Sequence, residues 1–432
     1  MSSKPSVVLL GFFARGNAGD EAFLHVQHDL LKDDFHVIVP IEHKNACEGF
    51  QTWEPYNQCE IINYDDVPRV YGPDVAALHI GGGSLPFGFS GQFLMSALDA
   101  QKRTMITGVD SSVKSALGRD HIRFDIYNRL DVFSVRTTKS IFNLRKAGVG
   151  VHHGADWALG LKAIEPPAHK RGGALVTLRN FGTPDQEHID AVNRLHAYLE
   201  RQGHKVRYLP FAPDDQRFMK FFPTATPENT ELCWHDPRQV KGLIGAADVV
   251  VSVGRLHTLI MSMTSQVPTL AIDPKIMVDG KHILNRKNVF FCEEVGLPFY
   301  YSVDEMIAEY GDDFNQRVKV IDFAPDYYER LKQQFELVLK TARGDADVDK
   351  SWRAGALAVP SLAAAAPQPG MMFAGPKPPK GAETPERLAA REAKREAKRQ
   401  GRIRAKEERQ AENAAEGEVA KTPESVNTSD AA

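Results

Sequence analysis

The feature that most constrains the fold is an alternation of short apolar runs with amphipathic stretches, repeated in two successive blocks. The apolar runs are residues 7–11, 37–40, 75–80, 104–108 and 132–135 in the first block, and 174–178, 206–210, 248–252, 269–272 and 288–291 in the second. Short apolar runs separated by helical patterns are typical of parallel strands joined by crossover helices. We therefore expect two α/β domains in succession.

The amphipathic stretches predict the helices that accompany these strands. They are residues 21–31, 140–149, 185–202, 236–245, 256–265 and 325–342. Glycine follows several of them, as is usual at helix C-termini. Residues 162–173 interrupt the pattern, because Pro166-Pro167 and Arg171-Gly172-Gly173 disfavour regular structure.

These boundaries predict four parts of the chain. They are an N-terminal domain over 1–165, a C-terminal domain over 172–324, a closing helix over 325–342 and a tail over 343–432. A cleft between two such domains is a common place for a binding site. The tail is rich in Ala, Pro and Gly and then in charged residues, which predicts a flexible linker and a solvated helix. Contact of its basic stretch, 387–409, with a membrane surface, RNA or a protein partner is the alternative.

Composition narrows the class of protein. The formal net charge of −3 argues against a nucleic-acid partner for the protein as a whole. The four cysteines lack CxxC spacing, so we expect reduced thiols rather than a zinc site or disulfides. Residues 1–6 are short and polar, and no apolar stretch approaches the roughly 18 residues of a membrane helix. We expect a cytoplasmic protein, acting either free or at the inner face of the membrane.

Two glycine-rich turns follow predicted strands. In the first, residues 11–22, backbone N–H groups at a helix N-terminus can hold a ligand, and Asn17 and Asp20 lie at that position. A tight turn that only packs the helix on the sheet is an equal alternative. In the second, Gly81, Gly82 and Gly83 predict a ligand lying against bare backbone, because glycine in regular structure costs about 0.5–1 kcal/mol.

Cationic side chains also follow predicted strands. Arg136 comes after 132–135, with Ser140 at the start of the next helix, and Arg179 comes after 174–178. Arginine can bind a carboxylate or phosphate through two parallel hydrogen bonds. Arg255 and His257 follow the buried run 248–252, where the arginine offers anion contacts and the histidine can transfer a proton.

Taken in order, these segments resemble the polysaccharide pyruvyl transferases. Gly16-Asn17-Ala18-Gly19-Asp20-Glu21 resembles the GNxGDE signature of that family, and Gly81-Gly82-Gly83 its glycine run. Val135-Arg136 with Ser140 is similar to the family's VRDxxS, Gly154-Ala155-Asp156 to its GxD, and Arg255-Leu256-His257 to its RLH. Gln266-Val267-Pro268 with Lys275 resembles the following G-x-P…K. This sequence departs from the family at Thr137, where Asp is usual, and at Gln266, where Gly is usual.

The resemblance implies a GT-B-like fold, in which two Rossmann-like, doubly wound domains face a central cleft. It implies an enzyme that moves a pyruvyl group from phosphoenolpyruvate to a sugar of an exopolysaccharide or cell-surface glycan, forming a cyclic ketal. The acceptor, free or lipid-linked, is expected on the N-terminal side and the donor on the C-terminal side, with no cofactor and no metal. His257 and Arg255 are the expected catalytic residues. The expected substrate-binding residues are Asn17, Asp20, Gly81, Gly82, Gly83, Arg136, Ser140, Arg179, Leu256 and Lys275.

Two other functions are open. A GT-B glycosyltransferase that uses a nucleotide sugar would have the same organisation. The second domain lacks an evident acid for the donor ribose, which argues against it, and Glu293-Glu294 are the acids that could serve. A non-catalytic homologue that scaffolds a polysaccharide assembly complex through its charged tail is favoured only by Thr137.

Overall fold

The computed structural model describes residues 4–66, 70–84, 89–110, 124–146, 148–273, 276–278, 281–283, 286–320, 326–345 and 352. These residues belong to one compact unit, Met1–Pro360. The predicted tail helix and the basic stretch 387–409 lie outside the described residues.

The first lobe is built on a parallel sheet of seven strands, counted over the described residues, in the order β3-β2-β1-β4-β5-β6-β7. The strands are β1 (Ser6–Leu10), β2 (His36–Ile41), β3 (Glu60–Asn63), β4 (Val75–Gly81), β5 (Arg103–Val109), β6 (Val132–Val135) and β7 (His152–His153). The strand order reverses direction between β1 and β4, and ligands of doubly wound sheets bind at the carboxyl ends of strands at such a point.

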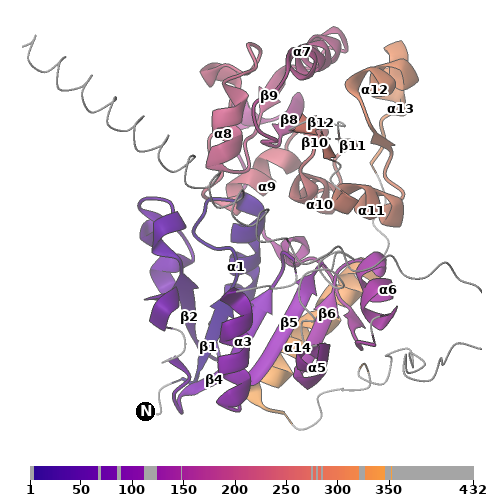
Figure 1. The fold of residues 1–432 in the computed structure, drawn as a ribbon. Helices are drawn as coiled ribbons and strands as arrows, with labels where there is room; N and C mark the ends of the chain where they lie inside the picture. The colour runs from indigo at the N-terminus through magenta and orange to yellow at the C-terminus, as the bar shows by residue number, and fades with distance from the viewer. Residues whose placement is uncertain are drawn as a thin grey trace, which may run out of the picture. The chain divides into compact units, whose positions relative to one another are not determined.

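Helices cover both faces of this sheet (Figure 1). They are α1 (Ala18–Leu31), α3 (Phe89–Asp99), α5 (Phe124–Arg129), α6 (Thr138–Lys146) and, from the far end of the described chain, α14 (Asp326–Arg343). The side chain of Asn17 caps α1 by accepting a hydrogen bond from the backbone N–H of Gly19 at 3.2 Å. Because α1 packs against the sheet on one side and the second lobe on the other, it is buried on most of its surface.

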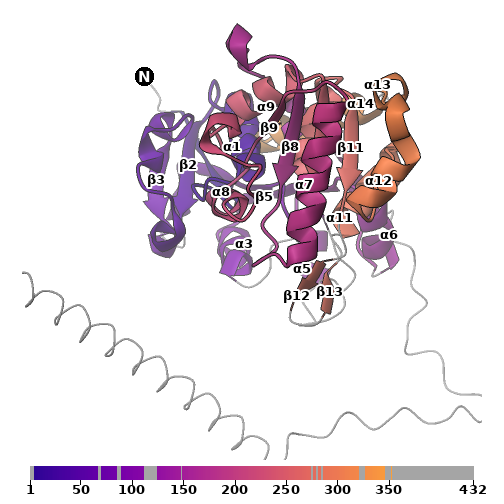
Figure 2. The ribbon, with the colours of Figure 1, turned by 90° about the horizontal axis from the view of Figure 1, so that it is seen from above.

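The second lobe has a smaller parallel sheet, five strands among the described residues, in the order β14-β11-β10-β8-β9. Its strands are β8 (Ala174–Leu178), β9 (Val206–Tyr208), β10 (Val249–Val253), β11 (Thr269–Ile272) and β14 (Phe299–Tyr300). Its helices are α7 (Gln186–Arg201), α8 (Pro213–Met219), α9 (Pro237–Gly245), α10 (Leu256–Thr264), α11 (Arg286–Val295), α12 (Val303–Tyr310) and α13 (Phe314–Arg317). Figures 1 and 2 show α7 and α12 side by side, where Arg194 and Asp304 form an ion pair at 2.8 Å.

The remaining elements are short. An antiparallel hairpin is formed by β12 (Ile276–Val278) and β13 (Lys281–Ile283). The 3₁₀ helices are η1 (His43–Asn45), η2 (Phe50–Thr52), η3 (Tyr56–Gln58), η4 (Tyr64–Asp66), η5 (Trp157–Gly160), η6 (Ala168–Lys170), η7 (Pro227–Asn229) and η8 (Gly311–Asp313).

The closing helix α14 packs back on the first lobe. Gln334 accepts hydrogen bonds from the hydroxyl of Ser134 at 2.7 Å and the backbone N–H of Ala155 at 3.2 Å, and it donates to the carbonyl of Ala155 at 3.2 Å. The ring of Phe335 stacks on Trp157 with centroids 5.2 Å apart. The first lobe therefore contains both the beginning and the end of the described chain (Figure 1).

One sequence prediction about the elements is wrong. Residues 288–291 are expected to form a strand, but they lie in α11, and the last strand of the second sheet is β14. Phe291 and Cys292 are buried as part of a helix face. A short apolar run cannot distinguish a buried strand from a buried helix segment.

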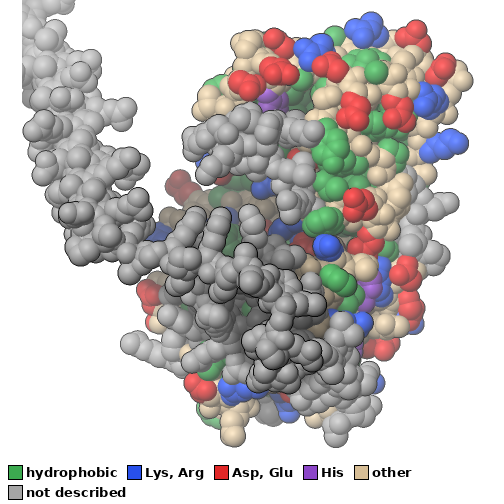
Figure 3. All heavy atoms as spheres, turned by 45° about the vertical axis from the view of Figure 1, so that its right-hand side comes forward, with side chains coloured by type: hydrophobic (Ala, Val, Ile, Leu, Met, Phe, Trp, Pro, Cys, Tyr) green, Lys and Arg blue, Asp and Glu red, His purple; other side chains and the backbone are tan. Residues whose placement is uncertain are grey.

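The surface carries charges of both signs. In Figure 3, Lys and Arg side chains are interspersed with Asp and Glu over the second lobe, in keeping with the net charge of −3. No helix of the described chain combines the length and the apolar character needed to span a bilayer.

Candidate functional site

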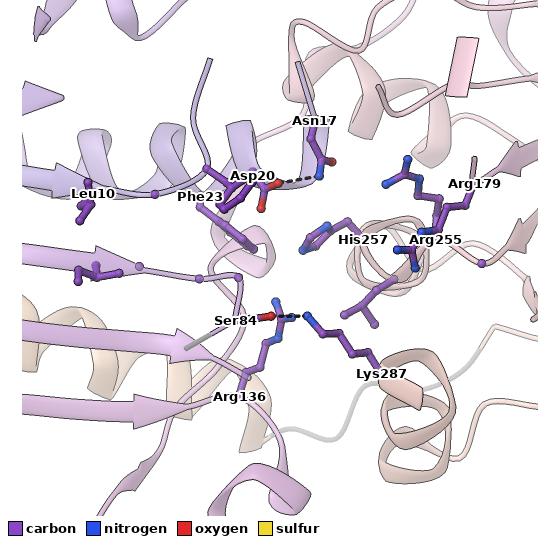
Figure 4. Close-up of a pocket in the computed structure, with 18 residues that line it drawn as sticks. Leu10, Asn17, Asp20, Phe23, Ser84, Arg136, Arg179, Arg255, His257 and Lys287 are labelled. Atoms are coloured by element: carbon purple, nitrogen blue, oxygen red, sulfur yellow. Dashed lines mark hydrogen bonds between the residues drawn. The ribbon is translucent and has the colours of Figure 1, made fainter. Parts of the chain in front are cut away.

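A cavity of about 620 Å³ lies between the two lobes, at the carboxyl ends of strands from both sheets (Figure 4). The first lobe contributes the turns after β1 and β4, the beginning of α1, and Arg136 after β6. The second lobe contributes Arg179 after β8, residues 254–257 after β10, and Lys287 of α11. The lining residues are Leu10, Gly11, Phe12, Asn17, Asp20, Phe23, Ile80, Gly81, Gly82, Gly83, Ser84, Arg136, Arg179, Gly254, Arg255, Leu256, His257 and Lys287.

Arg255 is oriented by an ion pair within its own lobe. It precedes α10 at the end of β10, and its guanidinium forms an ion pair with Asp215 of α8. Asp215 is fully buried and also accepts hydrogen bonds from the backbone N–H groups of Asn180 at 2.9 Å and Phe211 at 3.2 Å. Because Asp215 has so many partners on its own lobe, it orients Arg255 toward the cavity without extending into it.

His257 comes from the first turn of α10 and points toward the first lobe (Figure 4). Its ring meets Phe23 edge-on, with centroids 5.0 Å apart at 80°. Its Nε2 atom lies 3.8 Å from a carboxylate oxygen of Asp156 and has no hydrogen-bond partner among the described residues. Burial and the nearby cations lower the pKa of His257 well below 6.5. The imidazole is therefore neutral at pH 7, and burial and these cations oppose its protonation.

Arg136 is buried in an ion triad. Its Nη1 atom donates to Asp156 at 2.5 Å, while Nε and Nη2 both donate to one oxygen of Asp110, from Nε at 2.8 Å. Three of its five N–H groups are thus used by two carboxylates. The sequence prediction treats Arg136 as a clamp for a substrate anion. Its charge is already balanced inside the protein, so its position on the cavity wall is better suited to holding Asp110 and Asp156.

Asp20 lies on the cavity wall at the start of α1. One of its carboxylate oxygens accepts a hydrogen bond from the side-chain amide of Asn17 at 2.6 Å. Burial raises the pKa of Asp20 to about 6, against the lowering effect of Lys287, Arg136 and Arg255. Asp20 is therefore a group that changes its protonation near neutral pH at the edge of the cavity.

Packing constrains the glycine run in addition to the ligand contact that the sequence predicts. A Cβ on Gly81 would lie 2.3 Å from Gln27, and one on Gly82 would lie 2.3 Å from Phe23. These two glycines are therefore required for packing against α1, although both line the cavity. A Cβ on Gly83 would meet no atom of the described residues within 4 Å, unlike a Cβ on Gly81 or Gly82.

Other predicted residues lie as follows. Leu256 lines the cavity, whereas Ser140 does not reach it, because Ser140 is buried with its hydroxyl 2.8 Å from that of Thr137. Ser140 is thus placed to order the start of α6 rather than to bind substrate directly. Lys275 lies outside the described residues.

The structure shows what Thr137 and Gln266 do at the two positions where the sequence departs from the family pattern. The hydroxyl of Thr137 donates to Asp110 at 3.2 Å and accepts from the backbone N–H of Ser140 at 3.3 Å, so Thr137 caps α6. An acid remains beside Arg136, and it comes from the end of β5 as Asp110. Gln266 adopts a left-handed conformation with φ of 53°, which favours the glycine usual at that position.

Eight of the lining residues are not among the site residues expected from the sequence, and Lys287 and Phe12 are two of these. Lys287 extends from α11 across the cavity edge and donates to the hydroxyl of Ser84 at 2.7 Å (Figure 4). It lies directly before residues 288–291, which are expected as a strand, and a lone lysine carries no pattern. Phe12 is 63% exposed at the cavity. Phe12 belongs to the glycine-rich turn. A pair of adjacent aromatic residues in a turn, Phe12 and Phe13, is the sequence signal that could have identified it.

Arg179 differs from Arg136 and Arg255, which both form ion pairs with buried carboxylates. Its guanidinium lies 5.5 Å from the ring centroid of Phe181 and has no ion pair within the part of the chain that the structure describes. Burial and the neighbouring Arg255 lower its pKa. The second lobe therefore presents a cationic wall that a bound anion would stabilise.

The two facing sheets and the cleft between their carboxyl ends define a GT-B-like protein. The structure is similar to that of a UDP-N-acetylglucosamine 2-epimerase from Listeria monocytogenes, with a TM-score of 0.51 and 14% identity over 81% of this chain and 99% of that one. It is also similar to MnaA of S. aureus, solved with UDP, with a TM-score of 0.52 and 12% identity over 79% of this chain and 95% of that one. Such identities establish the fold alone.

The sequence itself identifies the family. The family model described as polysaccharide pyruvyl transferase matches residues 17–275, more than half of the chain. The chain belongs to the polysaccharide pyruvyl transferase family. No curated protein matched it in a sequence search.

Proposed function

We propose that this protein transfers a pyruvyl group from phosphoenolpyruvate to two hydroxyls of a sugar, forming a cyclic ketal and releasing phosphate. The observation that carries the proposal is the cavity wall formed by Arg179, Arg255 and His257. Among the residues that the structure describes, Arg179 has no ion pair and Nε2 of His257 has no hydrogen-bond partner. Membership of the family supports a transferase acting on sugars.

The donor carries two anionic groups, a carboxylate and a phosphate, and needs cations for both. Arg179 and Arg255 lie on the second lobe, and Lys287 approaches from α11. Arg136 adds no net charge, because Asp110 and Asp156 more than balance it. We therefore assign donor binding to Arg179, Arg255 and Lys287, with charge-assisted hydrogen bonds as the main attraction.

The reaction requires a proton to enter and protons to leave. Protonation of the donor's methylene carbon breaks its C=C bond and leaves an oxocarbenium-like centre. A sugar hydroxyl then forms a C–O bond there and loses its proton to a base. A second hydroxyl displaces phosphate from the same carbon and gives up its proton to the departing phosphate, which closes the ketal.

Two groups in the cavity fit the proton transfers. His257 is neutral when the cavity holds no anion, and a bound dianion would raise its pKa, so it can serve as base or acid. Asp20, with its pKa near 6, is a second proton donor on the opposite lobe. We assign the main transfer to His257, and comparison of His257→Ala with Asp20→Asn separates the two roles.

The test follows phosphate release from phosphoenolpyruvate in the presence of candidate sugars. We expect His257→Ala to abolish turnover with an unchanged fold by circular dichroism. His36→Ala is the matched control, because His36 is exposed on β2 and lies among the residues that line a different cavity. Wild-type turnover by His257→Ala contradicts the role assigned to His257, and no phosphate release by the wild type with any sugar contradicts the donor.

A nucleotide-sugar glycosyltransferase is the second candidate, since MnaA of the same fold was solved with UDP. The acid suggested for the donor ribose does not support it. Glu294 accepts a hydrogen bond from the backbone N–H of Thr138 at 3.1 Å, lies 3.4 Å from His153 and is not among the cavity residues. Thermal-shift measurements with phosphoenolpyruvate and with UDP- and GDP-sugars distinguish the two donors.

Two finer expectations remain proposals. A cytoplasmic site of action, free or at the inner membrane face on a lipid-linked acceptor, is tested by fractionation of cells. A non-catalytic scaffold is tested by deleting residues 344–432, because an enzyme retains turnover after this deletion and a scaffold loses its partner.

A further inference from the structure

The two walls of the cavity differ in character. The cations of the second lobe face a wall of the first lobe that includes the apolar side chains of Leu10, Phe12, Phe23 and Ile80. Leu10, Phe23 and Ile80 are buried in the core, whereas Phe12 is 63% exposed. Phe12 is therefore the aromatic side chain of this wall whose ring is accessible to a ligand.

The exposure of Phe12 is built into a rigid turn. The carbonyl of Gly11 accepts a hydrogen bond from the hydroxyl of Tyr64 at 3.0 Å. Ala14 adopts a left-handed conformation with φ of 62°, held by hydrogen bonds from its N–H to Tyr56 at 2.5 Å and from Cys47 N–H to its carbonyl at 2.7 Å. A non-glycine residue in this conformation is unfavourable by roughly 1–2 kcal/mol and persists only where its surroundings impose it. The turn thus holds Phe13 in the core and Phe12 outside.

The guanidinium of Arg15 covers one face of the Phe12 ring. The guanidinium of Arg15 lies 4.2 Å from the ring centroid, and Arg15 is fixed by an ion pair with Glu42 at 2.5 Å. A ring fixed by a cation on one face presents its other face in a defined orientation.

The size of the cavity leaves room for a second ligand. At about 30 Å³ per water molecule, 620 Å³ corresponds to roughly twenty waters. A donor as small as phosphoenolpyruvate leaves most of this volume vacant. Among the residues that line the cavity on the first lobe, Phe12 supplies an apolar ring that the carbon-bound hydrogens of a sugar can cover.

We propose that Phe12, held by Arg15, is the platform on which the acceptor sugar ring stacks, so that the first lobe binds the acceptor through an aromatic face. This inference rests on the proposed function. The occupant is a pyranose ring, because its hydroxyl edge can point to Asp20 and His257 while its apolar face covers the aromatic ring.

The test measures steady-state kinetics of Phe12→Ala with phosphoenolpyruvate and the best acceptor from a panel of methyl glycosides of glucose, galactose, mannose and N-acetylmannosamine. We expect the KM for the sugar to rise by roughly threefold to tenfold, the size of one aromatic contact, with the KM for phosphoenolpyruvate unchanged. Phe12→Trp should restore acceptor binding, and Arg15→Ala should give a smaller rise. Phe142→Ala is the matched control, since Phe142 is 56% exposed on α6 and does not line the cavity.

Ligand-observed NMR with the same methyl glycosides, recorded without the donor, separates failure of this inference from failure of the proposed function. Weaker sugar binding by Phe12→Ala than by the wild type supports the platform whatever the donor is. In the NMR experiment, equal sugar binding by both proteins or no binding by the wild type overturns the inference. In the kinetic experiment, a parallel rise in the KM values for the sugar and for phosphoenolpyruvate overturns it.

Discussion

Replacing Gly19 by alanine tests whether α1 holds His257 in its working position. A Cβ at residue 19 would lie 1.8 Å from Nδ1 of His257, whereas ordinary contact begins at 3.4 Å. The imidazole or the helix must therefore give way by about 1.6 Å, the difference between these distances. A displacement of about 1 Å at a reacting group can lower a rate by roughly a hundredfold.

The same substitution has two opposing effects on stability. Alanine is better than glycine inside a helix by about 0.5–1 kcal/mol, and Gly19 lies in α1. Overpacking of a dense region costs about 1–3 kcal/mol. We expect Gly19→Ala to lower the free energy of unfolding by about 1–2 kcal/mol and kcat by about a hundredfold, with a smaller change in the KM for phosphoenolpyruvate.

Phosphate release and urea unfolding measure these two quantities. Gly72→Ala is the control, because a Cβ there would meet only a backbone oxygen at 4.0 Å, so both quantities should remain at the wild-type values. The double variant with His257→Ala has no ring to displace. Its free energy of unfolding should equal or exceed that of His257→Ala alone. The reasoning is refuted if Gly19→Ala has wild-type kcat, or if Gly19→Ala destabilises the protein equally with and without the imidazole.

Two further predictions concern stability. Asp20 has a pKa near 6 in the folded protein and 3.8 otherwise, so between these values the folded state binds more protons and loses stability as the pH rises. Asp20→Asn should therefore raise the free energy of unfolding at pH 8 by up to about 3 kcal/mol and have little effect on it below pH 4. Urea titrations at both pH values measure this, and equal changes at the two pH values would contradict the prediction. Gln266→Gly should stabilise the protein by up to about 1 kcal/mol by relieving its left-handed backbone, measured by thermal unfolding; Gln266→Ala, which keeps the strain, should not.

Most strands of the two sheets were readable from the sequence, because they are buried on two faces and therefore appear as continuous apolar runs. The partly exposed strands β3, β7 and β14 were not. Positions 255 and 257 were identified because both lie directly after such a run, and in a parallel sheet the carboxyl ends of strands meet at one edge. The same rule explains why Arg179 and Asp20 line the cavity.

The ion pairs and packing neighbours of the cavity residues could not be predicted from the sequence. Arg136 is neutralised by acids 26 and 20 residues away in the chain, and that pairing depends on how three strands align. Lys287 was missed because its helix contains a short apolar run that also fits a strand. Gly81 and Gly82 were interpreted as ligand contacts because glycine patterns do not show which side chain fills the space, here Gln27 and Phe23.

The return of α14 to the first lobe has a consequence for how the chain is made. Ser134 and Ala155 find their partner in Gln334, 200 and 179 residues later, and Arg103 donates to the carbonyl of Ala342, 239 residues later. Because translation proceeds from the N-terminus, the ribosome must complete the second lobe before the first has its last helix. During that interval the face around Trp157 lacks its stacking partner, so the nascent chain exposes apolar surface that a chaperone can bind.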